Sequence, residues 1–192
     1  MKFFFLRHTS LKVGSDIFYG QTDLDVSDSF SSELEIIKKK IIVEEIDTKK
    51  IKVFSSPLKR CLKLARSISD NVIIDDRLKE LNLGDWEMKK MGSISRKEIE
   101  KWENNLLTYK IPNGESNRDF LKRLRSFLDE IIKLQEDLMI VAHAGSINGM
   151  ISNLINEPFD KLIKNYWEKI RYGSLSLIKI DKKENKIIYI GK

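Results

Sequence analysis

The chain has 192 residues, 41% of them hydrophobic, and a net charge of +6. A chain of this length usually forms one domain of two or three packed layers, and the composition excludes disordered, collagen-like and disulfide-rich proteins. Charges of both signs alternate in segments such as Lys97–Lys101, which indicates a solvated surface; a field that attracts anionic substrates is the alternative. No basic stripe with interleaved aromatic residues predicts a nucleic-acid partner.

The sequence shows no signal for secretion, for a membrane or for disulfide bonding. Its one cysteine, Cys61, excludes an intramolecular disulfide, which suits a reducing compartment, and its place on an apolar helix face predicts a core residue. The apolar start, Met1–Leu6, is too short for a signal peptide, and no run approaches the ~20 residues of a membrane span. We therefore expect a cytoplasmic protein without a membrane partner, and the sequence leaves a homodimer open.

Short apolar runs that predict buried strands alternate along the chain with helical patterns. The predicted strands are, in chain order, Phe3–Leu6, Ile51–Phe54, the weaker Val72–Ile74, and Leu138–Ala142. The predicted helices are Ser31–Glu44, Pro57–Ser69, a short one near Ser95–Leu107, and Asn117–Gln135. This alternation predicts a three-layer α/β/α fold with a mainly parallel central sheet covered on both faces.

Two of these helices have marked starts. Ser55 or Ser56 can cap the second helix, and Pro57 fits its first turn, where a missing N–H costs nothing. Ser116 is the candidate N-cap of the longest helix, with Asp119 in the first turn, where negative charge is favoured. An apolar stripe at helical spacing predicts that this longest helix buries one face.

Two segments depart from the alternating pattern. Gly84–Gly114 is more polar and less periodic, and we interpret it as a small insertion on the rim of the site, within a single domain that spans residues 1–192. Near the C-terminus, Ser174–Ile180 alternates apolar and polar residues, and Lys186–Ile190 follows after a turn-like stretch. This predicts a terminal antiparallel hairpin at an edge of the sheet.

The most informative residues follow directly after predicted strands. Arg7 and His8 come after the first strand, Arg60 shortly after the second, and His143 after the last parallel strand. Ligands of doubly wound sheets bind outside the carboxyl ends of the strands, so we expect these four side chains in one crevice. Arginine presents a planar fork of donors that matches phosphate oxygens, which makes the cluster a predicted site for a phosphate dianion.

A helix start is also predicted at this edge of the sheet. The small residues Ala144, Gly145 and Ser146 lead from His143 into an apolar helical run. A helix that begins there would aim free backbone N–H groups at the same anion, so Ala144 is a candidate phosphate-binding position.

Five blocks of the sequence resemble, in order, the signatures of the histidine phosphatase (phosphoglycerate mutase-like) superfamily. The blocks are Leu6–Thr9, Ser55–Ala65, Arg77–Glu87, Pro112–Ser116 and Val141–Gly145, and they resemble "RHG", "SSPLxRAxxTA", "RLxExxxGxWEG", "PxGES" and "VxHGG". They span nearly the whole chain. The resemblance implies the histidine phosphatase fold and phosphoryl transfer without a metal or cofactor.

Three residues depart from these signatures. Thr9 and Ala144 stand where glycine is commoner, and Met88 stands where a glycine usually follows the third block. We expect the first two changes to leave catalysis intact, and the Met88 change to affect only the shape of the rim insertion.

The resemblance implies a role for each matched residue. His8 is then the nucleophile that forms a phosphohistidine, and Glu80 is the general acid for the leaving group and later the base for water. Arg7, Arg60 and His143 are placed to stabilise the phosphoryl oxygens. Positive charge from the two arginines predicts that His8 is neutral, as a nucleophilic imidazole must be.

Further candidates lie in the loop after the first strand and in the rim. Gly20 and Gln21 are candidates for substrate binding, and Gly20 allows a close approach of the backbone. The aromatic rim residues Trp86, Trp102 and Tyr109 could stack on the base of a nucleotide-like substrate, although packing of the insertion against the body is the favoured interpretation. Glu115 and Ser116 are interpreted as a helix start.

The segment Tyr19–Val26 resembles α-ribazole phosphatases, and the short rim insertion suits a small phosphatase better than a glycolytic mutase. We therefore expect a metal-independent phosphomonoesterase that acts on a small molecule, α-ribazole 5′-phosphate of cobalamin biosynthesis. A cofactor-dependent phosphoglycerate mutase and a broad-specificity phosphatase are alternatives within the same fold. A non-catalytic phosphate-binding module is a further alternative, which the intact set of matched residues disfavours. Two histidines leave too few ligands for a metal-dependent hydrolase.

Overall fold

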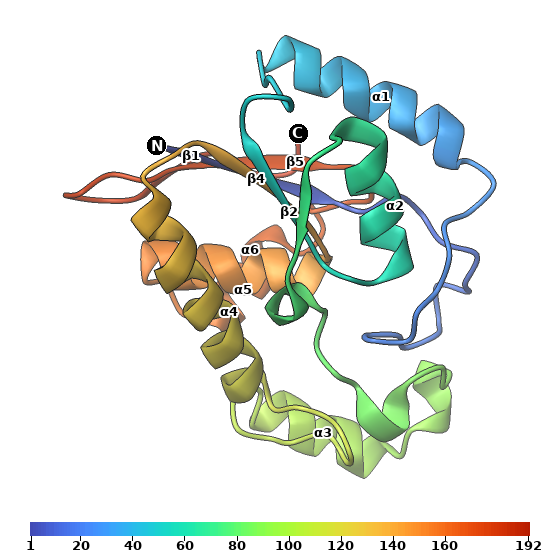
Figure 1. The fold of residues 1–192 in the computed structure, drawn as a ribbon. Coiled ribbons are helices and arrows are strands. Elements are labelled where there is room, and N and C mark those ends of the chain that lie inside the picture. The colour runs from blue at the N-terminus through green and yellow to red at the C-terminus, as the bar shows by residue number, and fades with distance from the viewer.

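The computed structural model describes residues 1–192 and has one six-stranded sheet between two layers of helices, as Figure 1 shows. The strands are β1 (Lys2–Arg7), β2 (Lys52–Ser55), β3 (Val72–Ile74), β4 (Leu138–Ala142), β5 (Leu175–Lys179) and β6 (Lys186–Tyr189). The helices are α1 (Phe30–Val43), α2 (Lys59–Ile68), α3 (Arg96–Asn104), α4 (Asn117–Ile131), α5 (Ala144–Ile155) and α6 (Phe159–Tyr166). The predicted three-layer α/β/α fold is confirmed.

The sheet has the strand order β3-β2-β4-β1-β5-β6. β1 pairs in parallel with β4, β4 with β2, and β2 with β3. β5 runs antiparallel to β1, and β6 runs antiparallel to β5, so the predicted terminal hairpin is confirmed. Every residue of β4 is buried, because helices cover both faces of the sheet, and this explains its uninterrupted apolar sequence.

The two faces of the sheet bury separate apolar cores. Successive residues of a strand point to opposite faces, so Phe3 packs in the core with α4, α5 and α6, while Phe4 packs in the core with α1 and α2. Figure 1 shows these two helix layers above and below the sheet. Cys61 is fully buried in the second core, as its helix face predicts.

Two predicted helix ends differ from the observed ones. α2 begins at Lys59 with Leu58 as its N-cap, and no side chain caps it. The prediction that Ser55 or Ser56 caps this helix is wrong, because the Ser56 hydroxyl is bonded to a histidine ring at the sheet edge instead. The longest helix, α4, ends at Ile131 and continues only as a 3₁₀ turn to Leu134, because Gln135 is left-handed with φ of 58°.

The start of α4 agrees with the sequence pattern. The Ser116 side chain accepts a hydrogen bond from the backbone N–H of Asp119 at 3.1 Å, so the predicted N-cap is confirmed. A cap of this kind contributes about 1 kcal/mol to the stability of the helix.

The segment from Gly84 to Gly114 extends below the three-layered body in Figure 1 and contains α3. Trp86 is only 2% exposed and packs against Trp102 and Tyr109, with ring centroids 5.9 and 6.0 Å apart. The interpretation of these aromatic residues as packing residues is confirmed. Met88 has a left-handed φ of 60°, a conformation that glycine adopts without strain, and this explains why glycine suits that position.

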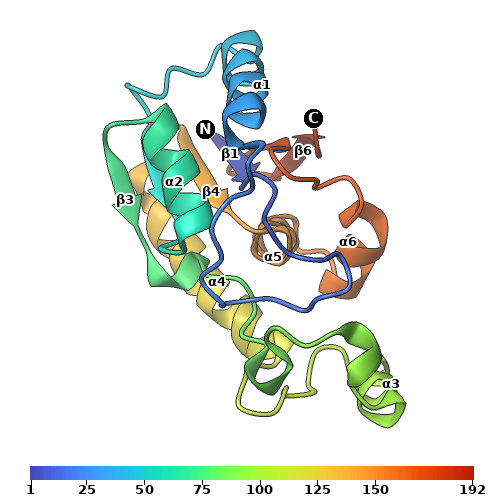
Figure 2. The same ribbon diagram turned by 90° about the vertical axis from the view of Figure 1, so that its right-hand side faces the viewer.

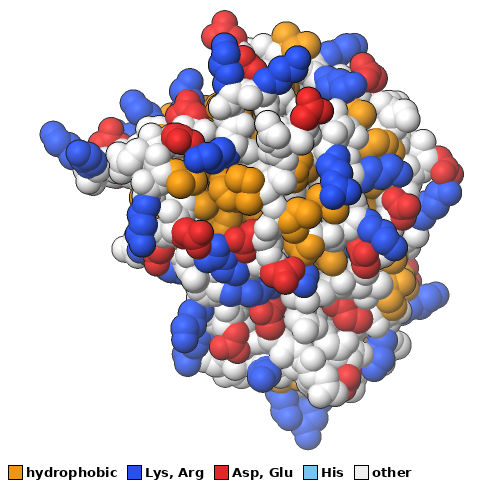
Figure 3. Space-filling model, viewed as in Figure 1, with side chains coloured by type: hydrophobic (Ala, Val, Ile, Leu, Met, Phe, Trp, Pro, Cys, Tyr) orange, Lys and Arg blue, Asp and Glu red, His pale blue; other side chains and the backbone are white.

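The surface carries mixed charge. On the face shown in Figure 3, lysine and arginine side chains are interspersed with aspartate and glutamate over the whole area, which agrees with the interpretation of a solvated surface. No helix in the structure is long and apolar enough to cross a membrane.

Parallel pairing brings the carboxyl ends of β1, β2 and β4 to one edge of the sheet. Figure 2 shows the long loop after β1 crossing this edge, in front of the end of α5. The residues that follow the three strands therefore lie beneath a loop, and not at an open surface.

Candidate active site

The four residues predicted at the strand ends lie together. Arg7 is the last residue of β1, His8 follows it, and His143 follows β4. The ring centroids of His8 and His143 are 5.2 Å apart, and the Arg60 Nε lies 3.1 Å from a nitrogen of His143. His8 and His143 are each 1% exposed and Arg60 is completely buried, so this cluster is enclosed.

The His8 ring has a defined tautomer. Its Nδ1 lies 2.7 Å from the carbonyl oxygen of Thr9, which only accepts hydrogen bonds, so Nδ1 carries the proton and Nε2 keeps a free lone pair. Burial lowers the pKa of His8 well below 6.5, and the charges of Arg7 and Arg60 lower it further. The lowered pKa supports the predicted neutral state of His8. Burial lowers this pKa more than the charges of the two arginines do, whereas the sequence suggested the charges alone.

His143 is also neutral, with the opposite tautomer. Arg60 always carries its proton on Nε, so this N–H donates to Nδ1 of His143, and the Nε2–H of His143 then donates to the Ser56 hydroxyl at 2.9 Å. Burial lowers the pKa of His143 well below 6.5, with the Arg60 charge as the next cause. In this structure the one N–H of His143 is therefore bound to Ser56, and an oxyanion would have to replace Ser56 as its acceptor.

Arg60 is held by three hydrogen bonds inside the protein. Besides its bond to His143, it donates to the carbonyl of Thr22 at 2.8 Å and to the carbonyl of Gly20 at 2.6 Å. A guanidinium has five N–H donors, so two of them are left for an oxyanion.

Two buried polar atoms beside His8 have no partner. The Arg7 guanidinium donates from one terminal nitrogen to the carbonyl of Ile170 at 2.7 Å, but its Nε and the hydroxyl of Thr9 make no hydrogen bond. Leaving a buried donor unpaired is unfavourable. Unpaired donors on both neighbours of His8 are what a site for a phosphoryl group provides.

Glu80 lies against the N-terminus of α5. Its two carboxylate oxygens accept hydrogen bonds from the N–H groups of Leu81 at 2.9 Å and of Gly145 at 2.8 Å. Burial raises the pKa of this carboxyl group, although both N–H groups and the Arg60 charge oppose the shift. A side chain at position 145 would collide with Glu80, so this glycine allows the carboxylate to reach the helix N-terminus. The sequence predicts the phosphate of the substrate at this place, and in the structure the N–H of Gly145 is bound to Glu80 instead.

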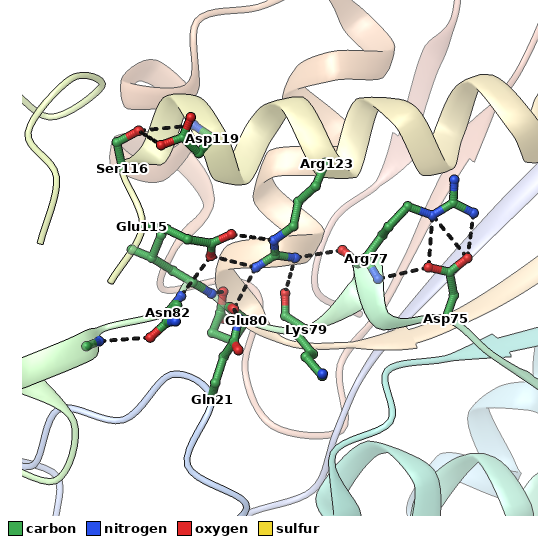
Figure 4. Close-up of polar contacts among 12 residues, drawn as sticks. Gln21, Asp75, Arg77, Lys79, Glu80, Asn82, Glu115, Ser116, Asp119 and Arg123 are labelled. Carbon is green, nitrogen blue, oxygen red and sulfur yellow. Dashed lines mark hydrogen bonds and ion pairs between the residues drawn. The ribbon is translucent and has the colours of Figure 1, made fainter. Parts of the chain in front are cut away.

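Arg123 of α4 fixes the segment that carries Glu80. Figure 4 shows its guanidinium between the carboxylate of Glu115 and the backbone of this segment. It donates to both oxygens of Glu115 at 2.7 and 2.9 Å, and to the carbonyls of Arg77, Lys79 and Glu80 at 2.7 to 2.8 Å. Glu115 is therefore more than the helix start that the sequence suggested.

Glu87 holds the loop that contains Gly20 and Gln21. Its carboxylate accepts hydrogen bonds from the N–H groups of residues 20 to 22, from the Thr22 hydroxyl and from the N–H of Leu83, at 2.6 to 3.2 Å. Burial tends to raise its pKa, but these donors outweigh burial, and the pKa is below its ordinary value.

The structure gives Gly20 and Gln21 contacts within the protein. A side chain at position 20 would collide with the Leu81 carbonyl, so Gly20 is required by the packing of its own loop. The Gln21 amide donates to the Glu80 carbonyl at 3.0 Å, which joins this loop to the segment of the candidate acid.

Three residues of this site were not assigned to it from the sequence: Ser56, Glu87 and Arg123. Ser56 and Glu87 lie inside the blocks Ser55–Ala65 and Arg77–Glu87, and membership of these blocks could have indicated that they belong to the site. Arg123 had a weaker signal, since it is a charged residue beside the buried stripe of an amphipathic helix. No group of three or more histidine, cysteine, aspartate or glutamate side chains has the arrangement of a metal site.

The chain is similar in sequence to proteins from other organisms. The chain is 25% identical, over its full length and 95% of the relative, to "Putative phosphoserine phosphatase 2" of Hydrogenobacter thermophilus. It is 30% identical, over 69% of the chain and 64% of the relative, to "Probable phosphoglycerate mutase GpmB" of Erwinia tasmaniensis.

Among solved structures, the α-ribazole phosphatase from Shigella flexneri matches 100% of this chain and 96% of its own with a TM-score of 0.85 and 22% identity. At this identity, the likeness shows a shared fold. The sequence model of the histidine phosphatase superfamily (branch 1) matches residues 3–191. The chain therefore belongs to the histidine phosphatase superfamily.

Proposed function

We propose that this protein is a metal-independent phosphomonoesterase that works through a phosphohistidine on His8. The observation that carries the proposal is the state of the His8 ring. Its Nε2 has a free lone pair, its pKa is low enough to keep it neutral, and unpaired donors lie on the residues on both sides of it. These are the requirements of a nucleophile that attacks a phosphate dianion.

In the first step, Nε2 of His8 attacks phosphorus in line, and the bond between phosphorus and the ester oxygen breaks. Arg7 and Arg60 donate hydrogen bonds to the phosphoryl oxygens, where charge is spread in the transition state. His143 donates its Nε2–H there in place of its hydrogen bond to Ser56. Glu80, kept protonated to higher pH by burial, gives its proton to the departing alkoxide.

In the second step, water attacks the phosphohistidine, and Glu80 takes the proton of that water. The bond between phosphorus and Nε2 breaks, inorganic phosphate leaves, and His8 returns to its neutral state. His8 and Glu80 therefore act in both steps of the cycle, and no proton carrier other than Glu80 is required.

We propose α-ribazole 5′-phosphate as the physiological substrate, which would place the protein in the cytoplasm and in cobalamin biosynthesis. The support is the segment Tyr19–Val26, which resembles that of α-ribazole phosphatases, together with the short rim insertion at about residues 84–114 of a single-domain chain. A mutase remains the alternative within the superfamily, because several relatives carry that name.

The test is phosphate release from α-ribazole 5′-phosphate, phosphoserine, 3-phosphoglycerate and p-nitrophenyl phosphate, with EDTA present, by wild type and His8→Ala. We expect α-ribazole 5′-phosphate to have the highest kcat/KM and His8→Ala to lose about 10⁴-fold or more of kcat, as expected for removal of a nucleophile. Acid-labile ³²P on the wild-type chain, absent from His8→Ala, would identify the phosphohistidine.

The outcomes separate the chemistry from the substrate. Similar slow rates with all four esters that still require His8 would leave the phosphatase chemistry standing and overturn the α-ribazole assignment. Interconversion of 2- and 3-phosphoglycerate that depends on a bisphosphate, without net phosphate release, would identify a mutase. Near-normal activity of His8→Ala would overturn the nucleophile assignment.

A further inference from the structure

Two hydrogen-bonded tyrosines lie beside the candidate phosphate site. Tyr19 lies in the loop after β1, and Tyr172 lies between α6 and β5, and their hydroxyl oxygens are 2.6 Å apart. The ring centroid of Tyr172 is 5.5 Å from that of His8, yet Tyr172 is 38% exposed. Tyr172 therefore contacts the nucleophile on one side and solvent on the other.

Each tyrosine ring also lies against one of the arginines beside His8. The Arg7 guanidinium carbon is 4.1 Å from the ring centroid of Tyr172, and that of Arg60 is 5.6 Å from the ring centroid of Tyr19. The rings thus border the donors of the candidate phosphate site. A phosphomonoester whose phosphoryl group reaches these donors must extend its leaving group past the two rings.

His8 is only 1% exposed, and the ring of Tyr172 lies beside it. A phosphomonoester therefore reaches Nε2 only when side chains that cover His8 move aside. The hydrogen bond between the two tyrosine hydroxyls is weak in net terms because water replaces it, so these two side chains can separate.

The other aromatic candidates are not available for a leaving group. Trp86, Trp102 and Tyr109 pack against one another within the rim insertion, and Trp86 is almost completely buried. The aromatic ring that packs beside His8 is that of Tyr172, and Tyr19 is hydrogen-bonded to it.

We propose that Tyr19 and Tyr172 are specificity-determining residues that part to admit the substrate and favour flat, unsaturated leaving groups over saturated ones. Ring pairs in offset or edge-on contact gain free energy beyond the area they bury. The inference rests on the proposed phosphatase function and names the class of leaving group, an alcohol that carries an aryl or heteroaryl group.

The test compares 2-phenylethyl phosphate with 2-cyclohexylethyl phosphate. Both are primary alkyl esters of the same length with six-membered rings, so they differ mainly in the flatness and unsaturation of the ring. We expect wild type to favour the phenyl ester by about two- to tenfold in kcat/KM. Tyr172→Leu and Tyr19→Leu should each reduce this preference, and Tyr172→Phe and Tyr19→Phe, which keep the ring, should retain it.

Other results would overturn the inference. An active, His8-dependent wild type with no preference for the phenyl ester overturns it while leaving the phosphatase function intact. Leucine variants that lose activity equally with both esters show a structural role only and overturn it as well. If wild type hydrolyses neither ester nor p-nitrophenyl phosphate, the proposed function fails, and this inference fails with it. Thermal unfolding of each variant shows whether it folds. If one leucine variant does not fold, the other still tests the role of the two tyrosines.

Discussion

The phosphate end and the leaving-group end of the candidate site are supported by different parts of the molecule. At the phosphate end, His8, Arg60 and His143 are buried and follow strands of the central sheet. At the leaving-group end, Glu80 lies on an irregular segment that depends on side-chain hydrogen bonds from Arg123 and on backbone N–H groups. The first end is fixed by a sheet, and the second by polar contacts of an irregular segment with α4 and the start of α5.

The two ends differ in the step of the reaction that they serve. Attack on phosphorus has the same geometry for every phosphomonoester, so the side chains that take part in it can be held rigidly at the edge of the sheet. Leaving groups differ, and loops can change shape without disturbing the sheet. Substitutions at the phosphate end should therefore affect all substrates equally, and those at the other end should act according to the leaving group.

Among the substitutions that leave His8 in place, Arg60→Lys is expected to have the largest effect across all esters. Lysine keeps the charge but loses the planar fork that donates to His143, Thr22 and Gly20. Loss of one oxyanion donor commonly lowers kcat by about 10²–10³-fold, and we expect the upper end of this range with every ester. Arg66→Lys, at an exposed position on the same helix, is the matched control. Wild-type kcat in Arg60→Lys would contradict the assignment of the phosphate end.

Glu80→Gln should show a dependence on the leaving group. We expect kcat for alkyl phosphates to fall by about 10²–10³-fold, because the alkoxide needs a proton from an acid. The loss with p-nitrophenyl phosphate should be much smaller, because p-nitrophenolate leaves without one. Glu100→Gln, at an exposed position of the rim, should behave like wild type. Equal losses with both kinds of ester would remove Glu80 as the acid.

Glu87→Gln should have a smaller effect, which acts through Arg60. The amide loses the charge that orders residues 20 to 22, and the carbonyls of Gly20 and Thr22 hold the guanidinium. We expect kcat to fall about tenfold, the scale of one charge-assisted hydrogen bond. When Glu87→Gln is combined with Arg60→Lys, it should lower kcat much less than it does alone, because the effects of substitutions within one hydrogen-bond network are not additive. Fully multiplicative losses would show that Glu87 acts independently of Arg60.

The pH dependence of stability should reveal the buried imidazoles. The pKa values of folded His8 and His143 lie well below 6.5, so only the unfolded chain takes up these protons as the pH falls below 6.5. The free energy of unfolding should therefore decrease, with a slope of up to about 1.4 kcal/mol per pH unit for each histidine. Urea unfolding between about pH 7 and pH 5.5 measures this slope. His8→Asn should reduce the slope by the contribution of one histidine. An unchanged slope in that variant would contradict the burial argument.

Local sequence patterns predicted the fold and the place of the phosphate end. The four apolar runs are the parallel strands β1 to β4, and β4 spans the predicted Leu138–Ala142. Buried strands need continuous apolar sequence, and the residue after a strand lies at the sheet edge, so His8 and His143 were located without knowing any contact. The start of α2 was misplaced, because the hydroxyl of Ser56 had a partner that no local pattern reveals.

The tertiary structure alone decided how the atoms of the site are connected. Glu87 and Gly20 are separated by 67 positions, and Ser56 and His143 by 87, and such pairings carry no periodicity that a sequence window could detect. The pairing of Tyr19 with Tyr172 likewise joins two loops that meet only after folding. Burial, the chief cause of the lowered pKa of both histidines, is a property of the packed chain. The sequence by itself determined which reactive groups lie at the sheet edge, and packing decided their tautomers, their pKa shifts and what covers them.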